Sequence, residues 1–293
     1  MDVFTILAVA AIILTVILGF NKRFSYVQML IFGNLVIFIL TLLNFAVGDD
    51  ALLDDLGFRP IYLTNGLDLY TIGTYMFVHA GFFHIIGNIL FLFLIGVQLE
   101  YRVGKPRTVL FYFVAGVGAA IAQALILGLD RYTLMVGASG AIAGLIGAML
   151  WLYPRDRIPM MVGPIFLPNV PVVLGVGVWL AMQLFLDLTS SGGGVAYAAH
   201  LAGFVIGIAL AAVVPKAVPR SEQSIDAGAL EDLAVTKRLK DDLQRIKEET
   251  EPAVRQAWLE HFVKEASCPR CGSKLHLKGN KIKCDCGYET KVR

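Results

Sequence analysis

Cysteine is missing from the first 267 residues of this 293-residue chain, and charged residues make up only 16% of it. The missing cysteines exclude disulfide bonds from that part. The shortage of charge, together with 57% hydrophobic residues and a mean hydropathy of +0.68, excludes an ordinary soluble domain. Apolar residues fill positions 1–214, whereas positions 215–293 are rich in Lys, Glu and Asp. The composition therefore predicts a membrane domain followed by a soluble tail.

Seven apolar segments are long enough, or nearly long enough, to cross a bilayer as helices. A hydrocarbon core of roughly 30 Å needs about 20 apolar residues in a helix. The predicted spans are approximately 2–20, 27–47, 83–99, 108–128, 138–153, 170–188 and 196–214. The shorter ones are expected to tilt, to start in a re-entrant loop or to be buried among the other helices. The predicted fold class is an all-α polytopic membrane protein.

Basic residues are scarce in the loops on one side of the predicted membrane. The loop 48–78 holds five aspartates against Arg59 alone, and the loop 189–195 carries no charge. Lys and Arg instead follow the first, third, fifth and seventh spans, as Lys22, Arg23, Arg102, Lys105, Arg107, Arg155, Arg157, Lys216 and Arg220. Since Lys and Arg stay on the cytoplasmic side, we expect an integral protein of the cell membrane with an extracytoplasmic N-terminus and a cytoplasmic tail.

A secretory signal is the alternative interpretation of the first apolar segment. The segment has no basic residues before its apolar run, carries Asp2, and shows no evident small-residue cleavage site. We therefore expect residues 1–26 to form a retained transmembrane helix.

Three of the five histidines, His79, His84 and His200, lie in or beside the predicted spans. Ionisable side chains inside a bilayer are costly, and they often mark functional sites. His84 and Asn88 are four residues apart in "HAGFFHIIGN", so they share one face of a helix at the outer end of the third span. For His79, an interfacial side chain that ties down the loop 48–78 remains an alternative.

A second candidate is Ser139, which follows an outer loop in "GASGAIAGLIG". Gly137 and Gly140 flank it closely, so a substrate backbone could approach its hydroxyl. The same small residues also fit a helix that merely packs tightly against another helix. The short Gly-x-Ser-Gly pattern does not separate these two interpretations.

The arrangement of the spans brings these residues together. His200 lies in "AYAAHLAGFVIG", beside a stripe of small residues at four-residue spacing, namely Ala199, Gly203, Gly207 and Ala211. The fifth and seventh spans both run from outside to inside. If their glycine stripes pack closely, Ser139 and His200 lie at similar depth near the outer surface, where His84 and Asn88 also lie. Agreement among three spans favours a functional site over packing alone.

The predicted chemistry is nucleophilic catalysis by a serine. A hydroxyl is a weak nucleophile until a base takes its proton, and His200 can do this. Neither span carries an Asp or Glu near the outer surface, so we expect a Ser–His dyad whose ring is held by packing. The side chains of Asn88 and His84 and the backbone N–H of Ser139 are candidate donors to an oxyanion. The run "SSGGGV" (190–195) could let the sixth span move aside for substrate, or be a plain hairpin loop.

The motifs "HAGFFHIIGN", "LEYRVGKPR", "GASG" and "AHLAGFVIG" together resemble the rhomboid proteases over roughly residues 27–214. The resemblance implies a six-helix core, preceded here by one extra helix. It implies Ser139 as nucleophile and His200 as general base. It also implies His84 and Asn88 as oxyanion donors, with supporting roles for His79, Gly137 and Gly140.

Two further positions follow from the resemblance. Leu99, Glu100 and Gly104 match a segment in which a buried carboxylate organises a turn. Ala143 departs from the family pattern, because many relatives carry an aromatic residue there that packs on the catalytic histidine. The orientation of His200 must then depend on other neighbours, such as Tyr197.

The function implied by the resemblance is an intramembrane serine endopeptidase that acts on single-span membrane proteins. It needs no cofactor for catalysis, and its site opens to the outer side of the membrane. One alternative is a catalytically silent rhomboid-like protein that binds and escorts membrane proteins, with the tail as an adaptor. A transporter is a third possibility, against which the lack of a convincing inverted repeat weighs.

The first part of the tail, residues 215–265, is predicted to be a helical linker. An apolar stripe on a charged background indicates an amphipathic helix formed by Leu230, Leu233, Leu239, Leu243 and Ile246. Pro252 is expected to break this helix, and Val254, Trp258 and Phe262 to start a second one.

The last part, residues 266–293, resembles a zinc ribbon. Cys268 and Cys271 form a Cys-x-x-Cys knuckle, and Cys284 and Cys286 follow as Cys-x-Cys after a stretch that alternates like a hairpin. Four thiolates in a reducing cytosol suit a tetrahedral, structural zinc ion, and His276 is a weaker candidate ligand. We expect a binding module for a cytoplasmic partner. Its lysines indicate a solvated face better than a nucleic-acid site, so nucleic acid is not an expected partner.

Overall fold

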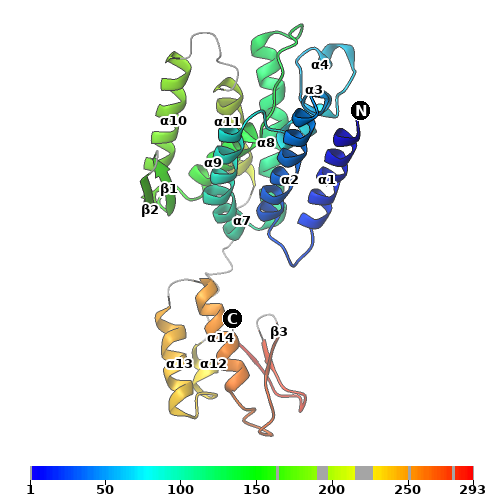
Figure 1. Cartoon of the computed structure of the whole chain (residues 1–293). Helices are drawn as coiled ribbons and strands as arrows, with labels where there is room; N and C mark the ends of the chain where they lie inside the picture. The colour runs from blue at the N-terminus through cyan, green and yellow to red at the C-terminus, as the bar shows by residue number, and fades with distance from the viewer. Residues whose placement is uncertain are drawn as a thin grey trace. The chain divides into compact units, whose positions relative to one another are not determined.

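The computed structural model describes residues 2–162, 165–189, 197–214, 227–249, 252–278 and 281–292. The chain forms two compact units, Met1–Ala217 and Val218–Arg293 (Figure 1). The run 190–195, expected to be a flexible loop, and the expected turn at 279–280 lie outside the described residues.

The first unit is built of helices. Three of them are long and apolar enough to cross a membrane. They are α2 (Tyr26–Ala46), α8 (Lys105–Leu127), and a continuous helix made of α6 (Phe82–Phe91), the π-helical segment η2 (Leu92–Gly96) and α7 (Val97–Val103). Four shorter apolar helices are α1 (Val3–Gly19), α9 (Ser139–Leu152), α10 (Val172–Thr189) and α11 (Tyr197–Val213). Helices thus occupy all seven apolar segments expected from the sequence.

Helix α9 lies at the centre of this unit. Each of its residues from Gly140 to Met149 is buried, and α8 and α11 pack directly against it. A Cβ atom on Gly203 of α11 would lie 2.1 Å from the carbonyl oxygen of Gly140, and one on Gly207 would lie 2.0 Å from that of Gly144. Small residues therefore let the two backbones touch, as the glycine stripes predict. Because protein surrounds α9, it does not need to be as long as a lipid-facing helix.

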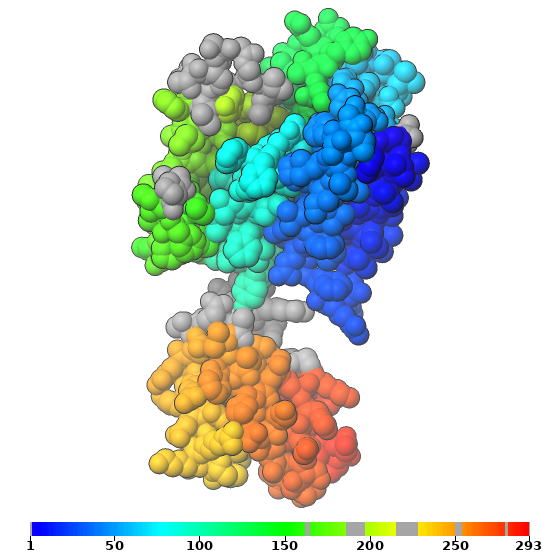
Figure 2. Space-filling view, viewed as in Figure 1, coloured from blue at the N-terminus to red at the C-terminus, as the bar shows by residue number. Residues whose placement is uncertain are grey.

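Helices α1 and α2 form a second packed pair, visible as the dark blue and blue surface in Figure 2. The Asp2 side chain accepts a hydrogen bond from the Thr5 N–H at the start of α1 (2.7 Å) and another from Asn44 Nδ2 near the end of α2 (2.8 Å). These bonds join the start of α1 to the end of α2.

The connection between α2 and α6 is partly buried, which the sequence did not predict. It contains α3 (Ala51–Leu56), α4 (Tyr62–Asn65), α5 (Thr71–Thr74) and the 3₁₀ turn η1 (Tyr75–Phe77). The backbone of Phe58 pairs with that of Met135, and the Tyr75 carbonyl accepts a hydrogen bond from the Gly137 N–H (2.9 Å). This connection therefore supports the segment that leads into α9.

A β-hairpin joins α9 to α10 where the sequence predicted only a loop. Its strands are β1 (Arg157–Val162) and β2 (Ile165–Pro171), which pair antiparallel (Figure 1). Asp156, just before β1, accepts a hydrogen bond from the Val172 N–H (2.9 Å) and forms an ion pair with Arg102 of α7 (2.9 Å). The base of the hairpin is thus fixed to the C-terminal end of the long helix.

The second unit has its own apolar core. Helices α12 (Ala227–Glu231), α13 (Lys237–Glu248) and α14 (Pro252–Glu265) pack with an antiparallel sheet of β3 (His276–Lys278), β4 (Lys281–Lys283) and β5 (Glu289–Lys291). Pro252 is the first residue of α14, because a proline fits the first helical turn but not the interior. The single helix expected before Pro252 is wrong, because the chain leaves the helix after Glu231 and Thr236 caps a new one at Lys237. A new helix does begin at Pro252, and β5 adds a strand that was not expected.

Candidate active site

Ser139 and His200 are in direct contact. Ser139 is the first residue of α9, and its Oγ lies 2.7 Å from Nε2 of His200, in the first turn of α11. The close contacts pair Gly140 with Gly203 and Gly144 with Gly207, so the two helices run parallel. The sequence predicted that these two side chains lie at similar depth. In the structure they are in contact although they are 61 residues apart in the chain.

His84 lies beside the segment that precedes Ser139, and Asn88 lies one turn further along α6. Gly137 has φ +109°, and a Cβ atom there would lie 2.4 Å from Nε2 of His84, so only glycine fits. Asn88 is buried and donates an Nδ2 hydrogen bond to the His84 carbonyl (2.8 Å). An amide nitrogen carries two hydrogens, so one remains available to a ligand.

His79 is fully buried and packs its ring edge-on against His84, with 5.0 Å between ring centroids and 67° between planes. Within the described residues neither of its ring nitrogens has a hydrogen-bond partner. Its contact is therefore with His84, and it bonds no side chain of the 48–78 connection.

Gln183 is the site residue that the sequence reasoning missed. Its Oε1 lies 2.9 Å from Nδ1 of His200, so the histidine ring is bonded on both nitrogens. Packing adds an edge-on contact from Tyr197, with 6.3 Å between ring centroids. A usable signal was present, because Gln183 is the one polar residue in the apolar stretch 172–185, and the rule that singled out the histidines applies to it equally.

The start of α9 adds backbone donors to the site. The first N–H groups of a helix have no partner within it, and they lie at the positive end of the helix dipole. The N–H groups of Ser139 and Gly140 occupy these positions. An anion that forms next to the Ser139 hydroxyl would therefore lie close to donors from the start of α9.

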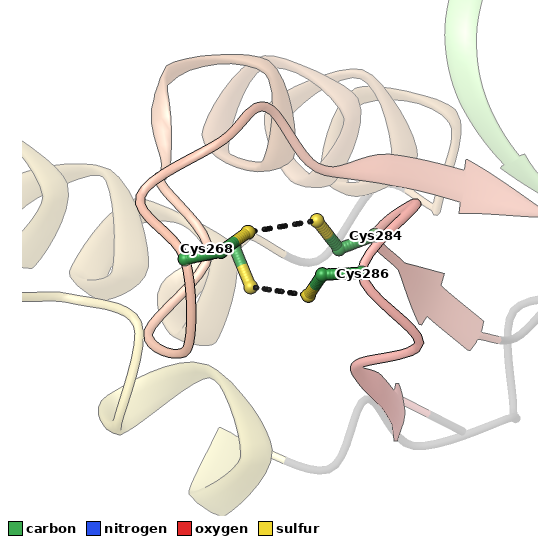
Figure 3. A group of neighbouring side chains, drawn as sticks. Cys268, Cys284 and Cys286 are labelled. Carbon is green, nitrogen blue, oxygen red and sulfur yellow. Dashed lines mark hydrogen bonds between the residues drawn. The ribbon is translucent and has the colours of Figure 1, made fainter.

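A second cluster, in the tail unit, consists of Cys268, Cys271, Cys284 and Cys286 (Figure 3). Their sulfur atoms all lie within 4.8 Å of one another, with 3.6 Å between Cys268 and Cys286 and 3.5 Å between Cys271 and Cys284. Tetrahedral zinc with Zn–S bonds of about 2.3 Å spaces its sulfurs by roughly 3.8 Å. The donor set therefore fits a zinc ion, and His276 is not part of it.

Each pair of cysteines lies on a turn that ends at a glycine. The Gly272 N–H donates to the Cys268 carbonyl four residues earlier (2.8 Å), and the Gly287 N–H donates to the Cys284 carbonyl three residues earlier (3.0 Å). Both glycines have positive φ, +75° and +87°. The Cys-x-Cys pair thus lies on a turn one residue shorter than that of the Cys-x-x-Cys pair.

Comparison with known proteins gives a consistent result. The family model for the Rhomboid domain matches residues 67–217, just over half of the chain. RHOMBOID-like protein 1 of Arabidopsis thaliana is 32% identical over 149 residues, which cover 49% of this chain and 34% of that protein. Rhomboid-related protein 2 of Mus musculus is 31% identical over 140 residues, which cover 47% and 45%.

A more distant relative is the mitochondrial Rhomboid protein 1 of Saccharomyces cerevisiae, 27% identical over 170 residues, which cover 55% of this chain and 46% of that protein. The chain thus spans between about a third and a half of the length of these three relatives.

Proposed function

Because the chain belongs to the rhomboid family, and is therefore an integral membrane protein, we propose that it is an intramembrane serine endopeptidase. Its nucleophile is Ser139 and its general base is His200. The observation that supports this most directly is the 2.7 Å contact between Ser139 Oγ and His200 Nε2. That distance suits transfer of the hydroxyl proton to the imidazole.

The reaction proceeds by acyl transfer. His200 Nε2 takes the proton as Ser139 Oγ attacks the scissile carbonyl carbon, which gives a tetrahedral oxyanion. The imidazolium then gives this proton to the leaving amine nitrogen, the C–N bond breaks, and an acyl-enzyme remains. Water attacks that ester with His200 again as base, which releases the second product and restores the serine. No cofactor takes part.

The oxyanion is stabilised by donors that lie in place before substrate arrives. They are the Ser139 N–H, the free hydrogen of Asn88 Nδ2 and an N–H of His84, with His79, Gly137 and Gly140 as supporting residues. Such preorganised donors need no reorganisation during the reaction, and each is typically worth a factor of about 10² to 10³ in rate.

The length of α9 supports a site inside the membrane. A helix of 14 residues is about 21 Å long, shorter than a hydrocarbon core of roughly 30 Å. If the inner end of α9, close to Arg155 and Arg157, lies at the cytoplasmic surface, Ser139 lies roughly 10 Å below the outer surface. We infer that the substrates are membrane proteins with a single span, cut within or near it.

An apolar pocket next to α10 supports this substrate class. It is lined from the long helix by Leu94, from α9 by Ile146, from the hairpin by Met160, and from α10 by Gly175 and Trp179. An almost wholly apolar lining suits the side chains of a membrane segment better than those of a soluble peptide.

The arrangement in the membrane is also part of the proposal. The core is formed by six helices, and α1 is the additional N-terminal helix. The six are α2, the continuous α6–α7, α8, α9, α10 and α11. The distribution of Lys and Arg places the N-terminus outside the cell membrane, the tail in the cytoplasm and the site toward the outer surface.

For the tail, we propose that the four cysteines hold one structural zinc ion. When bound, the zinc ion would crosslink the two turns that carry the cysteines, and it would take part in no step of catalysis. The tail then forms a zinc-ribbon-like module that binds a cytoplasmic partner.

The deciding experiment uses the purified full-length protein in detergent with a single-span substrate. Wild type should cut the substrate and be labelled at Ser139 by a fluorophosphonate, as detected by intact mass. Ser139→Ala and His200→Ala should each lose at least about 10³-fold in rate. Cutting that persists in both variants would exclude this mechanism.

The same experiment distinguishes the silent binding protein. Such a protein would retain a transmembrane ligand without cutting it, and it would not react with the probe. It would also have no use for a hydroxyl and an imidazole in hydrogen-bond contact, so the 2.7 Å distance favours the enzyme.

A further inference from the structure

The catalytic histidine is bonded to a helix other than the two that carry the dyad. Gln183 lies on α10, and its Oε1 is 2.9 Å from His200 Nδ1. It is half-buried in an otherwise apolar stretch of this helix. Placing an amide in such a segment costs free energy unless the amide finds a partner. His200 provides that partner.

The hydrogen bond bears on which ring nitrogen of His200 carries the proton. Oε1 of Gln183 faces Nδ1 and can only accept, so this orientation of the amide pairs with a hydrogen on Nδ1. In the neutral ring Nε2 then has a free lone pair, and that nitrogen is the one 2.7 Å from the Ser139 hydroxyl. A general base needs this tautomer, because the opposite one would present an N–H to the serine and could not take its proton.

Other contacts of the ring do not make this choice. The edge-on contact of Tyr197 comes from α11 itself and is apolar in character. Ala143 of α9 is buried but too small to stack on the ring. The hydrogen bond from α10 is the contact that favours one tautomer of the His200 ring over the other.

We propose that Gln183 is the positioning residue of the catalytic histidine, an uncharged equivalent of the carboxylate in a Ser-His-Asp triad. This inference rests on the proposed function. Gln183 keeps Nδ1 protonated, holds the ring toward Ser139, and stabilises the imidazolium that forms as the serine attacks. An amide does this without placing a second charge inside the bilayer, where an isolated carboxylate would be costly.

The position of Gln183 also makes the site depend on α10. Its neighbours Met182, Leu184 and Phe185 are 48%, 60% and 61% exposed, so this part of α10 lies at the edge of the bundle and faces lipid. The dyad itself is held by the tightly packed helices α9 and α11. The third hydrogen bond is present only while α10 stays in place against α11.

The test compares Gln183→Leu and Gln183→Glu in the full-length protein, with Met182→Leu as the matched control on the adjacent, exposed position. For each, kcat and KM on a single-span substrate are measured, together with the fluorophosphonate labelling rate and the thermal midpoint. We expect Gln183→Leu to lower kcat and the labelling rate at least about ten-fold, with KM within about two-fold. Gln183→Glu, which keeps an acceptor oxygen, should recover most of the labelling rate, and Met182→Leu should match wild type.

Two results would overturn the inference. A Gln183→Leu variant with wild-type kcat would show that the hydrogen bond has no role in the reaction. Equal losses in the Leu and Glu variants, with a lower thermal midpoint in both, would show a packing role only. These outcomes require an active wild type that Ser139→Ala inactivates. A wild type that neither cuts nor labels overturns the proposed function, and this inference with it.

Discussion

At the scale of single residues, the site combines groups from four elements around one hydroxyl. Ser139 comes from α9, His200 from α11, Gln183 from α10, and His84 with Asn88 from α6. Ser139, His200 and Gln183 are hydrogen-bonded to one another in sequence, which accounts for three polar side chains in helices that are otherwise apolar. The proposed catalytic role of Asn88 can be separated from its structural role. One amide hydrogen binds the His84 carbonyl, and the other is the proposed donor to the oxyanion.

Replacing Asn88 by Ala should lower kcat by about 10² to 10³-fold with a small change in KM, because an oxyanion donor acts mainly in the transition state. The measurement is the rate of cleavage of a single-span substrate in detergent.

Asn34→Ala is the matched control for Asn88→Ala. Asn34 on α2 donates the same kind of bond to the carbonyl four residues earlier, also 2.8 Å long. It should keep kcat while losing a similar amount of stability. Equal activity losses in the two variants would argue that Asn88 acts only by fixing its helix.

At the scale of helices, two contacts explain why the elements meet where they do. The first is Glu100 on α7, whose carboxylate accepts hydrogen bonds from the Ser25 hydroxyl (2.8 Å) and from the N–H groups of Tyr26 (2.9 Å) and Val27 (2.8 Å). It thereby caps the start of α2 from another helix and satisfies donors that α2 itself leaves free. Gly104, with φ +80°, follows at the end of α7 and turns the chain into α8.

Glu100→Ala should lower the free energy of unfolding by about 2 to 4 kcal/mol, because it leaves buried donors at the start of α2 without an acceptor. Equilibrium unfolding in mixed detergent measures this value. Asp50→Asn serves as control, since Asp50 is exposed and its side chain does not cap α3. Equal stability of the Glu100 and Asp50 variants would contradict the capping role.

The second contact is the glycine packing of α9 on α11. A Cβ atom on Gly203 would lie 2.1 Å from the Gly140 carbonyl oxygen, and this backbone atom can move only with its helix. Gly203→Ala should therefore separate the helices by at least about 1 Å, and such a displacement near the dyad costs on the order of 10²-fold in rate.

Cleavage rate and thermal midpoint should both fall in Gly203→Ala. Gly177→Ala on α10 is the matched control, because a Cβ atom there meets nothing within 4 Å. If both variants cut substrate at the same rate, close helix packing would not be what holds Ser139 against His200.

At the scale of the whole molecule, the chain is divided into two units with separate cores. The membrane unit centres on α9, whereas the core of the tail unit contains Leu259, Phe262 and Ile282 together with Cys268 and Cys284. A small unit of this kind depends on its metal, because binding energy at a structural zinc site is folding energy.

Zinc removal should therefore unfold the tail and leave the dyad working. Purified protein should contain about one zinc ion per chain, and a strong chelator should make the tail rapidly cleavable by trypsin without changing the fluorophosphonate labelling of Ser139. Cys271→Ser should lose the metal, while His276→Ala should keep it, since His276 is outside the cluster. A protein without zinc, or a tail equally resistant with and without chelator, would contradict this.

The elements that the sequence predicted well are those set by local pattern. Apolar runs of helical length lie at α1, α2, α6–α7, α8, α9, α10 and α11, and the bounds agree within a few residues. Four cysteines on two turns also follow from spacing alone. The hairpin β1–β2 and the buried connection between α2 and α6 were missed, because they are held by contacts with distant segments such as Asp156 with Arg102.

The residues of the candidate site were likewise predicted only in part. Ser139, His200, His84 and Asn88 stand out because each is polar in an apolar surrounding, and the glycine stripes indicate which helices meet. Gln183 stands out by the same rule and was passed over, but the sequence does not tell that its side of α10 faces His200. The expectation of a ring held by packing was therefore incomplete.

By itself the sequence determined which seven segments of the first 214 residues form apolar helices, because the transfer of apolar side chains from water depends on composition and not on partners. It also identified polar side chains in the apolar helices, whose burial in a membrane costs free energy unless they have a structural or functional role. Only the tertiary structure decided which of them touch, because the 2.7 Å and 2.9 Å bonds of His200 join segments 61 and 17 residues away. Such distances depend on how closely the helix backbones pack and on how each helix is rotated, and both are properties of the assembled bundle.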